Sequence, residues 1–133
     1  NPPPNLACRC FTHSTETILW AQKNDKKSRH FFDYQKMKEM NGGKQMKDVW
    51  TGALTKPSEK TEGKHPTQKP EYLLEKIVLA STEEGQVILD PFCGSGTTGV
   101  EAVRFGRKFI GIDVSEEYLE ISKRRLEKVA NDK

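Results

Sequence analysis

The sequence predicts an α/β fold in which parallel strands alternate with helices. Two short apolar runs, 87–90 and 108–112, contain β-branched residues and have the length of buried strands. Between them, 97–105 has the apolar spacing of a helix and is followed by a glycine. A strand, a helix and a second strand in this order form a parallel βαβ unit. The acidic residues that follow the two strand runs, Asp90 and Asp113, are therefore expected at the same edge of the sheet.

Two further helices are predicted around this unit. Segment 70–81 has apolar residues at helical spacing, begins with proline, and is expected to pack on the sheet. Ser115 is the predicted N-cap of a final helix that continues through Val129. The basic triplet Lys123 to Arg125 is expected on the solvated side of that helix.

Composition limits the size of the core. The chain has 133 residues, of which 34% are hydrophobic and 31% charged, with a mean hydropathy of −0.77. That length suits one domain, but the composition leaves little apolar material. A third strand is predicted over 17–22, and the polar run 36–47 is expected to be turn-rich surface with a turn at 41–43. With so few strands, exposed strand edges and apolar faces and a marginal stability are expected.

A glycine-rich turn with the sequence D-P-F-C-G-S-G-T-T-G, residues 90–99, joins the first strand of the unit to its helix. Its glycines permit backbone angles that are closed to other residues and allow a ligand to approach the main chain. Free N–H groups at the start of the helix favour an anionic group there. Asp113, 23 residues after Asp90, can accept hydrogen bonds from both hydroxyls of a ribose. The pattern predicts a site for an adenosine-containing cofactor.

The glycines Gly94, Gly96 and Gly99 also match the fingerprint of dinucleotide-binding enzymes. That alternative stays open but weak, because nothing downstream provides a second nucleotide-binding half. A phosphate-binding loop is excluded more firmly, since no Gly-Lys-Ser/Thr follows the glycines.

Two segments resemble one known family. Residues 90–98 resemble the D-P-F-x-G-S-G-T-T motif that binds S-adenosylmethionine in the amino-methylating DNA methyltransferases, which modify adenine N6 or cytosine N4. Residues 64–70, K-H-P-T-Q-K-P, resemble the segment just upstream in the same family. The resemblance implies a Rossmann-like S-adenosylmethionine-dependent methyltransferase fold, incomplete in this chain, with S-adenosylmethionine as cofactor.

The resemblance also implies a set of cofactor-binding residues, drawn from both motifs and from the end of the second strand. These residues are Lys64, His65, Pro66, Thr67, Asp90, Pro91, Phe92, Gly94, Ser95, Gly96, Thr97 and Asp113. By family analogy the two glycines and Thr97 contact the methionine end, Phe92 the adenine and Asp90 the amino group. Segment 64–67 is expected to close the site.

The family's catalytic motif, D/N/S-P-P-Y/F, is expected to be absent. Residues 1–4, N-P-P-P, have a proline where the aromatic belongs, and they resemble a later family loop instead. The resemblance thus implies three subregions: 1–23 as the end of the catalytic subregion, 24–63 as target recognition, and 64–133 as cofactor binding. The chain is then expected to be the carboxyl-terminal part of a longer enzyme. Methyl transfer is direct, so Cys93 is not expected to be a nucleophile.

The implied function is site-specific methylation of DNA, most simply at adenine N6, with double-stranded DNA and an amino-terminal part of the enzyme as partners. N4-cytosine methylation, a non-catalytic binding module and a homodimeric state remain open. Residues 1–69 have 13 basic and 7 acidic side chains against 9 and 12 in 70–133, so the first half is expected to face phosphates.

Other classes of protein find little support. No apolar run reaches the ~20 residues that span a membrane, so a cytoplasmic protein is expected. The three cysteines fit a reducing compartment. Cys8, Cys10 and His13 form at most a weak zinc motif, because no second ligand pair follows, and no metal site is expected.

Overall fold

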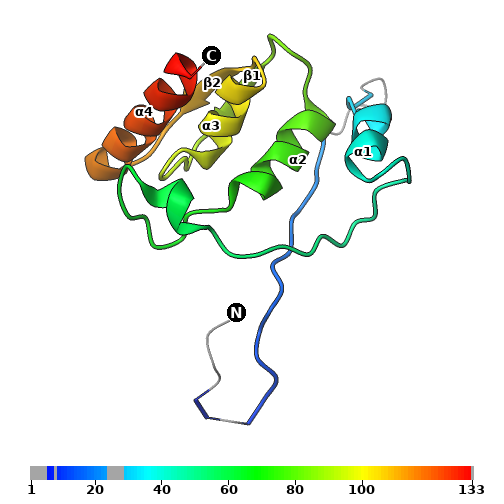
Figure 1. The fold of residues 1–133 in the computed structure, drawn as a ribbon, viewed down its shortest axis with the longest axis horizontal. Coiled ribbons are helices and arrows are strands. Elements are labelled where there is room, and N and C mark those ends of the chain that lie inside the picture. The colour runs from blue at the N-terminus through cyan, green and yellow to red at the C-terminus, as the bar shows by residue number, and fades with distance from the viewer. Residues whose placement is uncertain (1–5, 8, 24–28, 133) are drawn as a thin grey trace. The chain divides into compact units, whose positions relative to one another are not determined.

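The structure is a computed structural model that describes residues 6–7, 9–23 and 29–132. It divides into two compact units, 1–30 and 31–133, and the second contains the helices and strands of the described chain (Figure 1). In chain order these are α1 (Tyr34–Met40), the 3-10 helix η1 (Pro57–Lys60), α2 (Glu71–Ser81), β1 (Val87–Asp90), α3 (Thr97–Arg104), β2 (Lys108–Gly111) and α4 (Glu116–Asn131).

The predicted βαβ unit is confirmed. Strands β1 and β2 pair in parallel, with Leu89 beside Ile110 and Asp90 beside Gly111. Helix α3 connects them and ends one residue earlier than predicted, with Phe105 as its C-cap. The ladder continues past β2, because Ile112 N–H donates to the Asp90 carbonyl at 2.9 Å. The acidic ends of both strands therefore meet at one edge of the sheet.

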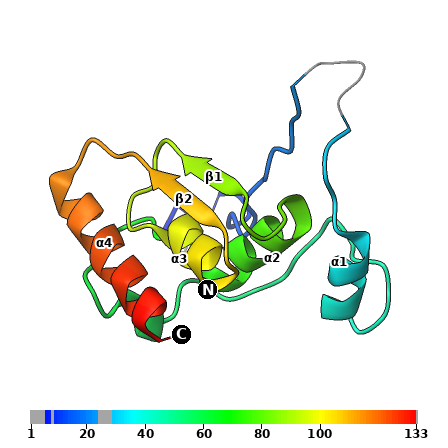
Figure 2. The same cartoon turned by 90° about the horizontal axis from the view of Figure 1, so that it is seen from above.

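The helices of the second unit form a layer on one side of the strands (Figure 2). Helix α3 packs against β1 and β2, and α2 and α4 pack against α3. Val100 and Ala102 of α3 are almost fully buried, together with Val78 of α2 and Ile121 of α4. Helix α2 packs mainly on α3 and α1, and the expectation that segment 70–81 packs on the sheet stays a prediction.

The opposite face of the sheet is exposed, as predicted. The neighbouring side chains Leu89 and Ile110 are 59% and 52% exposed, and Val87 and Ile112 beside them are exposed too. Ile88 and Phe109 alternate with them and are half-buried on the helix side. A parallel sheet is normally covered on both faces. The described chain supplies only one of the two layers.

Segment 17–22 is not a strand, contrary to the prediction. It is an irregular stretch in the first unit, in which Leu19 is 90% exposed and the ring of Trp20 meets that of His30 edge to face at 5.3 Å. A strand needs a hydrogen-bonded neighbour, and the sheet of the described residues consists of β1 and β2 alone. Among the described residues, segment 17–22 therefore has no strand beside it.

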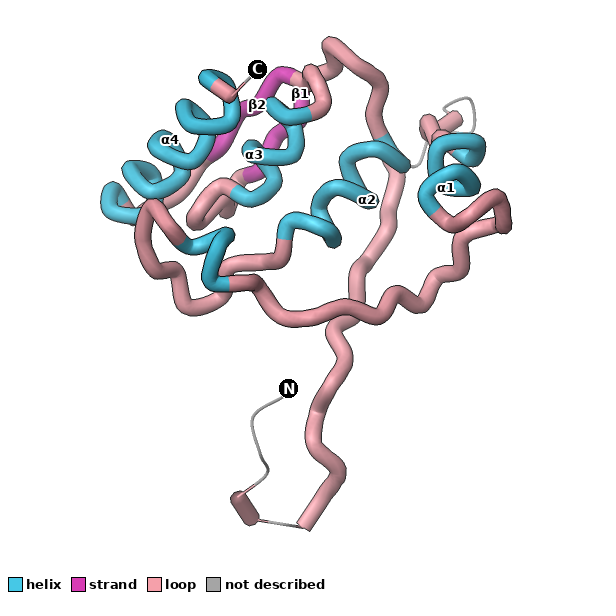
Figure 3. The backbone as a smooth tube through the Cα atoms, viewed as in Figure 1, coloured by secondary structure: helices cyan, strands magenta, loops and turns pink. Residues whose placement is uncertain are grey.

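The polar run 36–47 is only partly turn-rich surface. Helix α1 covers its first residues because the Asp33 side chain accepts from Lys36 N–H at 2.8 Å and Met37 is buried against α2. The predicted turn at 41–43 is present. Figure 3 shows the long loop that follows, from α1 to η1.

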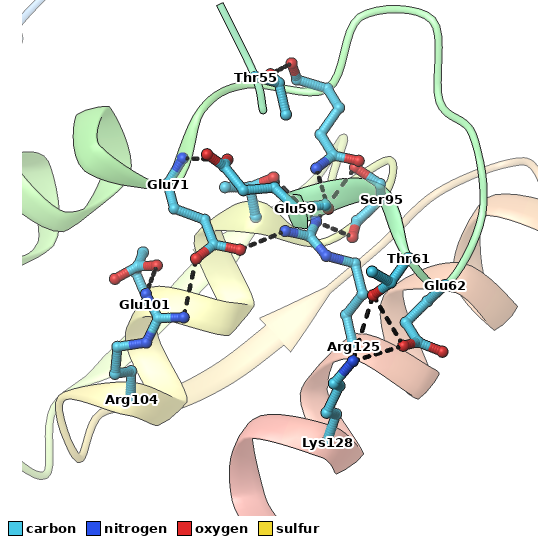
Figure 4. Close-up of polar contacts among 12 residues, drawn as sticks. Thr55, Glu59, Thr61, Glu62, Glu71, Ser95, Glu101, Arg104, Arg125 and Lys128 are labelled. Atoms are coloured by element: carbon cyan, nitrogen blue, oxygen red, sulfur yellow. Dashed lines mark hydrogen bonds and ion pairs between the residues drawn. The ribbon is translucent and has the colours of Figure 1, made fainter. Parts of the chain in front are cut away.

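One carboxyl group of α3 lies in the interior of the second unit. Glu101 is completely buried and pairs with Arg104, while its second oxygen, Oε2, has no hydrogen-bond partner in the described structure (Figure 4). Burial raises the pKa of Glu101 from its ordinary 4.5 to about 7, against the opposing effect of Arg104. The native state thus favours the protonated acid below neutral pH.

This buried acid predicts a stability that falls as the pH rises. Between about pH 4.5 and 7 the native chain binds a proton at Glu101 that the unfolded chain has released, so the free energy of unfolding decreases with pH. The decrease amounts to at most about 3 kcal/mol. Urea unfolding of the E101Q variant should show a flatter pH profile, whereas E120Q on the exposed side of α4 should follow the wild type. Parallel profiles for wild type and E101Q would contradict this assignment.

Candidate cofactor-binding site

A cleft of about 190 Å³ lies at the carboxyl end of β1. Two segments that are distant in the sequence form its walls: the turn after β1 and the K-H-P-T-Q-K-P segment that precedes α2. The residues that line it are His65, Thr67, Gln68, Lys69, Leu74, Asp90, Phe92, Cys93, Gly94, Ser95, Thr97 and Thr98.

The two glycines of the turn are required by different neighbours. Gly96 has φ +75°, and a Cβ on it would lie 2.1 Å from Ser122 Oγ of α4. Gly94 has φ +50°, and a Cβ there would lie 2.9 Å from His65 Nε2. Both backbone conformations favour glycine, and both positions lack room for a side chain. Gly96 thus allows α3 and α4 to approach each other closely, and Gly94 allows segment 64–67 to approach the turn.

Asp90 shapes the turn from within. Its Oδ2 accepts from Thr98 Oγ1 at 2.7 Å, and its Oδ1 accepts from Phe92 N–H at 3.1 Å. These bonds join the end of β1 to the first turn of α3. They leave the Phe92 ring 87% exposed beside the cleft, as a flat apolar surface.

Asp113 braces the turn from the end of β2. Its two oxygens accept from Gly94 N–H at 2.8 Å and from Ser115 N–H at 2.9 Å. The hydrogen bonds from Ser115 and Gly94 hold the pKa of this carboxyl below its ordinary value, so it is ionised at neutral pH. A carboxylate oxygen has more than one acceptor position, so this bracing leaves capacity for ribose hydroxyls.

His65 places its segment on the turn. Its ring meets Tyr118 of α4 edge to face, with centroids 4.2 Å apart, and its Nδ1 accepts from Thr67 N–H at 3.3 Å. The other ring nitrogen, Nε2, faces Gly94. Tyr118 in turn is held by the N-cap of α4, since its N–H donates to the predicted cap, Ser115 Oγ, at 3.3 Å.

The structure gathers seven of the twelve predicted cofactor-binding residues around the cleft. Those seven are His65, Thr67, Asp90, Phe92, Gly94, Ser95 and Thr97. The others lie outside its lining: Lys64, Pro66, Pro91, Gly96 and Asp113. Of these, Gly96 lies in the turn itself against Ser122, Asp113 accepts from Gly94 N–H of the turn, and Lys64, Pro66 and Pro91 are exposed.

Gln68 belongs to the cleft but was absent from the predicted set. It is 8% exposed, and its Nε2 donates to the Glu59 carbonyl at 2.7 Å. Its place inside the K-H-P-T-Q-K-P segment was the signal that could have identified it.

Cys93 is buried in the turn. Burial, together with the charges of Asp90 and Asp113, raises the pKa of its thiol above the ordinary value. A thiol that stays protonated is a poor nucleophile, in agreement with the expectation of direct methyl transfer.

Arg125 is buried at 5% exposure, so the expectation that the whole basic triplet is solvated was wrong for this residue. Lys123 and Arg124 are exposed as expected. Arg125 stands four residues after buried Ile121 and four before Val129, on the inward row of the helix. That spacing was the signal that could have placed it in the interior.

A larger cavity, of about 740 Å³, lies at the other end of α3, between the start of α1, the end of α2 and the turn before β2. Its lining contains none of the predicted cofactor-binding residues, so its size does not make it the candidate site. In the described part of the chain no three His, Cys, Asp or Glu side chains cluster as metal ligands, and Cys8 of the weak zinc motif falls outside that part. No helix among the described residues could cross a membrane.

Known proteins resemble the chain over nearly all of its length. It is 74% identical over 130 residues to the type II methyltransferase M2.LlaDCHI of Lactococcus lactis subsp. cremoris, and 73% identical over 127 residues to M2.DpnII of Streptococcus pneumoniae. The matches cover 98% and 96% of this chain but 48% and 47% of those proteins, so the chain spans about half the length of the curated relatives it matches.

A solved structure matches the fold as well. The crystal structure of an M1.HpyAVI–SAM complex aligns with a TM-score of 0.71 at 34% identity, over 95% of this chain and 57% of that one. Residues 1–124 also match the family model of the N6/N4 DNA methylases. The α/β unit, its glycine turn and these matches agree, and the chain belongs to the N6/N4 DNA methylase family.

Proposed function

We propose that this chain forms the cofactor-binding part of a DNA methyltransferase that moves a methyl group from S-adenosylmethionine to an exocyclic amino group of a DNA base. The observation that carries the proposal is the meeting of segments 65–69 and 90–98 around one cleft. These are the two segments whose sequences resemble the family motifs. Ligands of open α/β sheets bind outside the carboxyl ends of the strands, where this cleft lies.

The residues at the cleft suit the parts of S-adenosylmethionine. Amides in the first turn of α3 lack intrahelical acceptors and suit its carboxylate. The ionised Asp113 suits hydroxyl donors, the carboxyl oxygens of Asp90 suit an amino donor, and the exposed ring of Phe92 suits an adenine face. Lys64, His65, Pro66 and Thr67 would close over it.

The cleft is smaller than the whole site. Its volume of about 190 Å³ lies below the ~300 to 1,000 Å³ usual for ligand pockets. The exposed apolar face of the sheet, around Leu89 and Ile110, also lacks a covering layer. Both observations suit a chain that works together with further polypeptide, which would complete the pocket and cover that face.

That further polypeptide would also supply the acceptor half of the reaction. The bound cofactor provides a methyl group on a sulfonium, which needs no covalent enzyme intermediate. An exocyclic amino nitrogen must be brought in line with it, and an enzyme reaches such a nitrogen by turning the base out of the duplex. By family analogy a D-P-P-Y-type segment holds the flipped base. Residues 1–4, N-P-P-P, partly resemble that segment and lie outside the described residues.

Adenine N6 is the proposed target, because the overall sequence pattern resembles the adenine members of the family, with cytosine N4 as the alternative. The type II methyltransferases among the relatives suggest a role in a restriction-modification system. Double-stranded DNA is then the proposed partner, and the excess of basic residues in 1–69 suits its phosphates.

Removal of the Asp113 carboxylate should weaken cofactor binding. The D113A variant loses both the acceptor for Gly94 N–H and the proposed ribose contact, which should lower the affinity for S-adenosylmethionine about fivefold or more. Isothermal titration calorimetry on wild type, D113A and E120A would measure it, with E120A as an exposed carboxylate control on α4. Equal affinities for wild type and D113A would remove Asp113 from the site.

Methyl transfer should require the complementary half. The chain alone should incorporate no labelled methyl group into duplex DNA. Addition of a polypeptide that contains the family's D-P-P-Y segment should restore incorporation, and the product should be N6-methyladenine. The double substitution of Leu89 and Ile110 by threonine should reduce the restored activity, because it makes the exposed sheet face polar. Activity of the chain by itself would contradict the division proposed here.

A further inference from the structure

A buried guanidinium lies behind the glycine turn. Arg125 of α4 is 5% exposed, and its Nη1 donates to the Ser95 carbonyl at 2.7 Å and to Thr97 Oγ1 at 3.1 Å, with Ser95 Oγ at 3.4 Å. Its Nη2 pairs with Glu71 Oε1 of α2 at 3.0 Å. Figure 4 shows the guanidinium between Ser95 and Glu71.

We propose that Arg125 is a positioning residue that fixes the peptide unit between Ser95 and Gly96, and with it the shape of the turn that takes S-adenosylmethionine. This inference rests on the function proposed above. Arg125 would not itself touch the cofactor, because it is absent from the cleft lining and reaches the turn from the helix side.

The geometry of one peptide unit carries the argument. A peptide unit is planar, so the Ser95 carbonyl and the Gly96 N–H point in opposite directions from the same rigid group. Arg125 holds the carbonyl, and the Cys93 carbonyl accepts from Gly96 N–H at 2.8 Å. With both ends held, the unit cannot rotate. The turn of residues 93–96 then keeps a fixed set of amide directions at the start of α3.

The fork shape of the side chain matters for this task. Arg125 serves acceptors on the turn with one terminal nitrogen and the carboxylate of Glu71 with the other. A lysine has the same charge but a single nitrogen on a flexible stem. A lysine at position 125 can therefore bind either the turn or Glu71 well, but it cannot hold both in a fixed planar geometry.

Glu71 also links the K-H-P-T-Q-K-P segment to the turn. Glu71 Oε2 accepts from Arg104 at 2.9 Å, and Glu71 N–H donates to Glu59 Oε2 at 2.9 Å. The Glu59 carbonyl holds Gln68 of the cleft. Both walls of the cleft are therefore attached to one pair, Arg125 and Glu71, whose members come from α4 and α2.

Arg104 offers a matched control. It binds Glu71 and Glu101 in the same ionic cluster, and neither of these partners lies in the turn. The test compares R125M and R125K with R104M and with R124M, an exposed neighbour of Arg125, in the full 133-residue chain. One readout is the affinity for S-adenosylmethionine by calorimetry, and the other is amide hydrogen exchange without ligand, both below the melting transition of each variant.

Arg125→Met should weaken S-adenosylmethionine binding at least tenfold and speed exchange of the Gly96 amide at least tenfold. Arg125→Lys should recover part of each loss. Arg104→Met and Arg124→Met should leave both quantities within about twofold of wild type, and the Val103 amide, further along α3, should serve as an internal reference. These expectations follow because, of the three substituted residues, Arg125 is the one with hydrogen bonds to Ser95 and Thr97 of the turn.

Two results would overturn the inference: an unchanged Gly96 amide in R125M, or equal losses of affinity and protection in R125M and R104M, which would mark a general loss of stability. Failure of the wild-type chain to bind S-adenosylmethionine would count against the proposed function instead. The exchange measurement would still decide whether Arg125 fixes the turn.

Discussion

The turn between β1 and α3 keeps its shape because three other elements contact it. Asp113 at the end of β2 accepts from the Gly94 amide, Ser122 of α4 fills the space beside Gly96, and His65 covers Gly94. A Cβ at Gly94 or Gly96 would clash with His65 or Ser122, so both side chains pack directly against the backbone of the turn. The packing of α4 and the course of the loop before α2 are therefore tied to the geometry of one short turn.

Much of the βαβ unit could be predicted from the sequence. The strands over 87–90 and 108–111, the helix that begins at Thr97 and the Ser115 cap follow from local patterns that act over a few residues. The strand expected over 17–22 did not form, since strand formation depends on a neighbour that the described residues do not provide. Helix α1 was missed because its signal is a single cap, Asp33, before a mostly polar run.

The site was predicted in part for a related reason. Motif residues such as His65 and Asp90 lie at the cleft, as their segments indicated. The residues that support the turn from behind come from other elements; Asp113 was among the predicted residues, whereas Arg125 was not. A basic triplet usually indicates a solvated helix face, and this pattern outweighed the four-residue spacing of Arg125 from Ile121; the Ser95 carbonyl that Arg125 contacts lies 30 residues earlier. Long-range pairs of this kind depend on how helices pack, which short patterns do not encode.

The contact between Gly96 and Ser122 also constrains how sequences of this kind can diverge. The seryl Oγ stands 2.1 Å from the point where any larger residue at 96 would place its first carbon, so the two helices have no spare volume between them. A bulkier residue at 122 would push α4 away and carry Arg125, one turn further along, off the Ser95 carbonyl. Substitutions at position 122 should therefore be confined to small side chains, even though Ser122 is absent from the lining of the cleft.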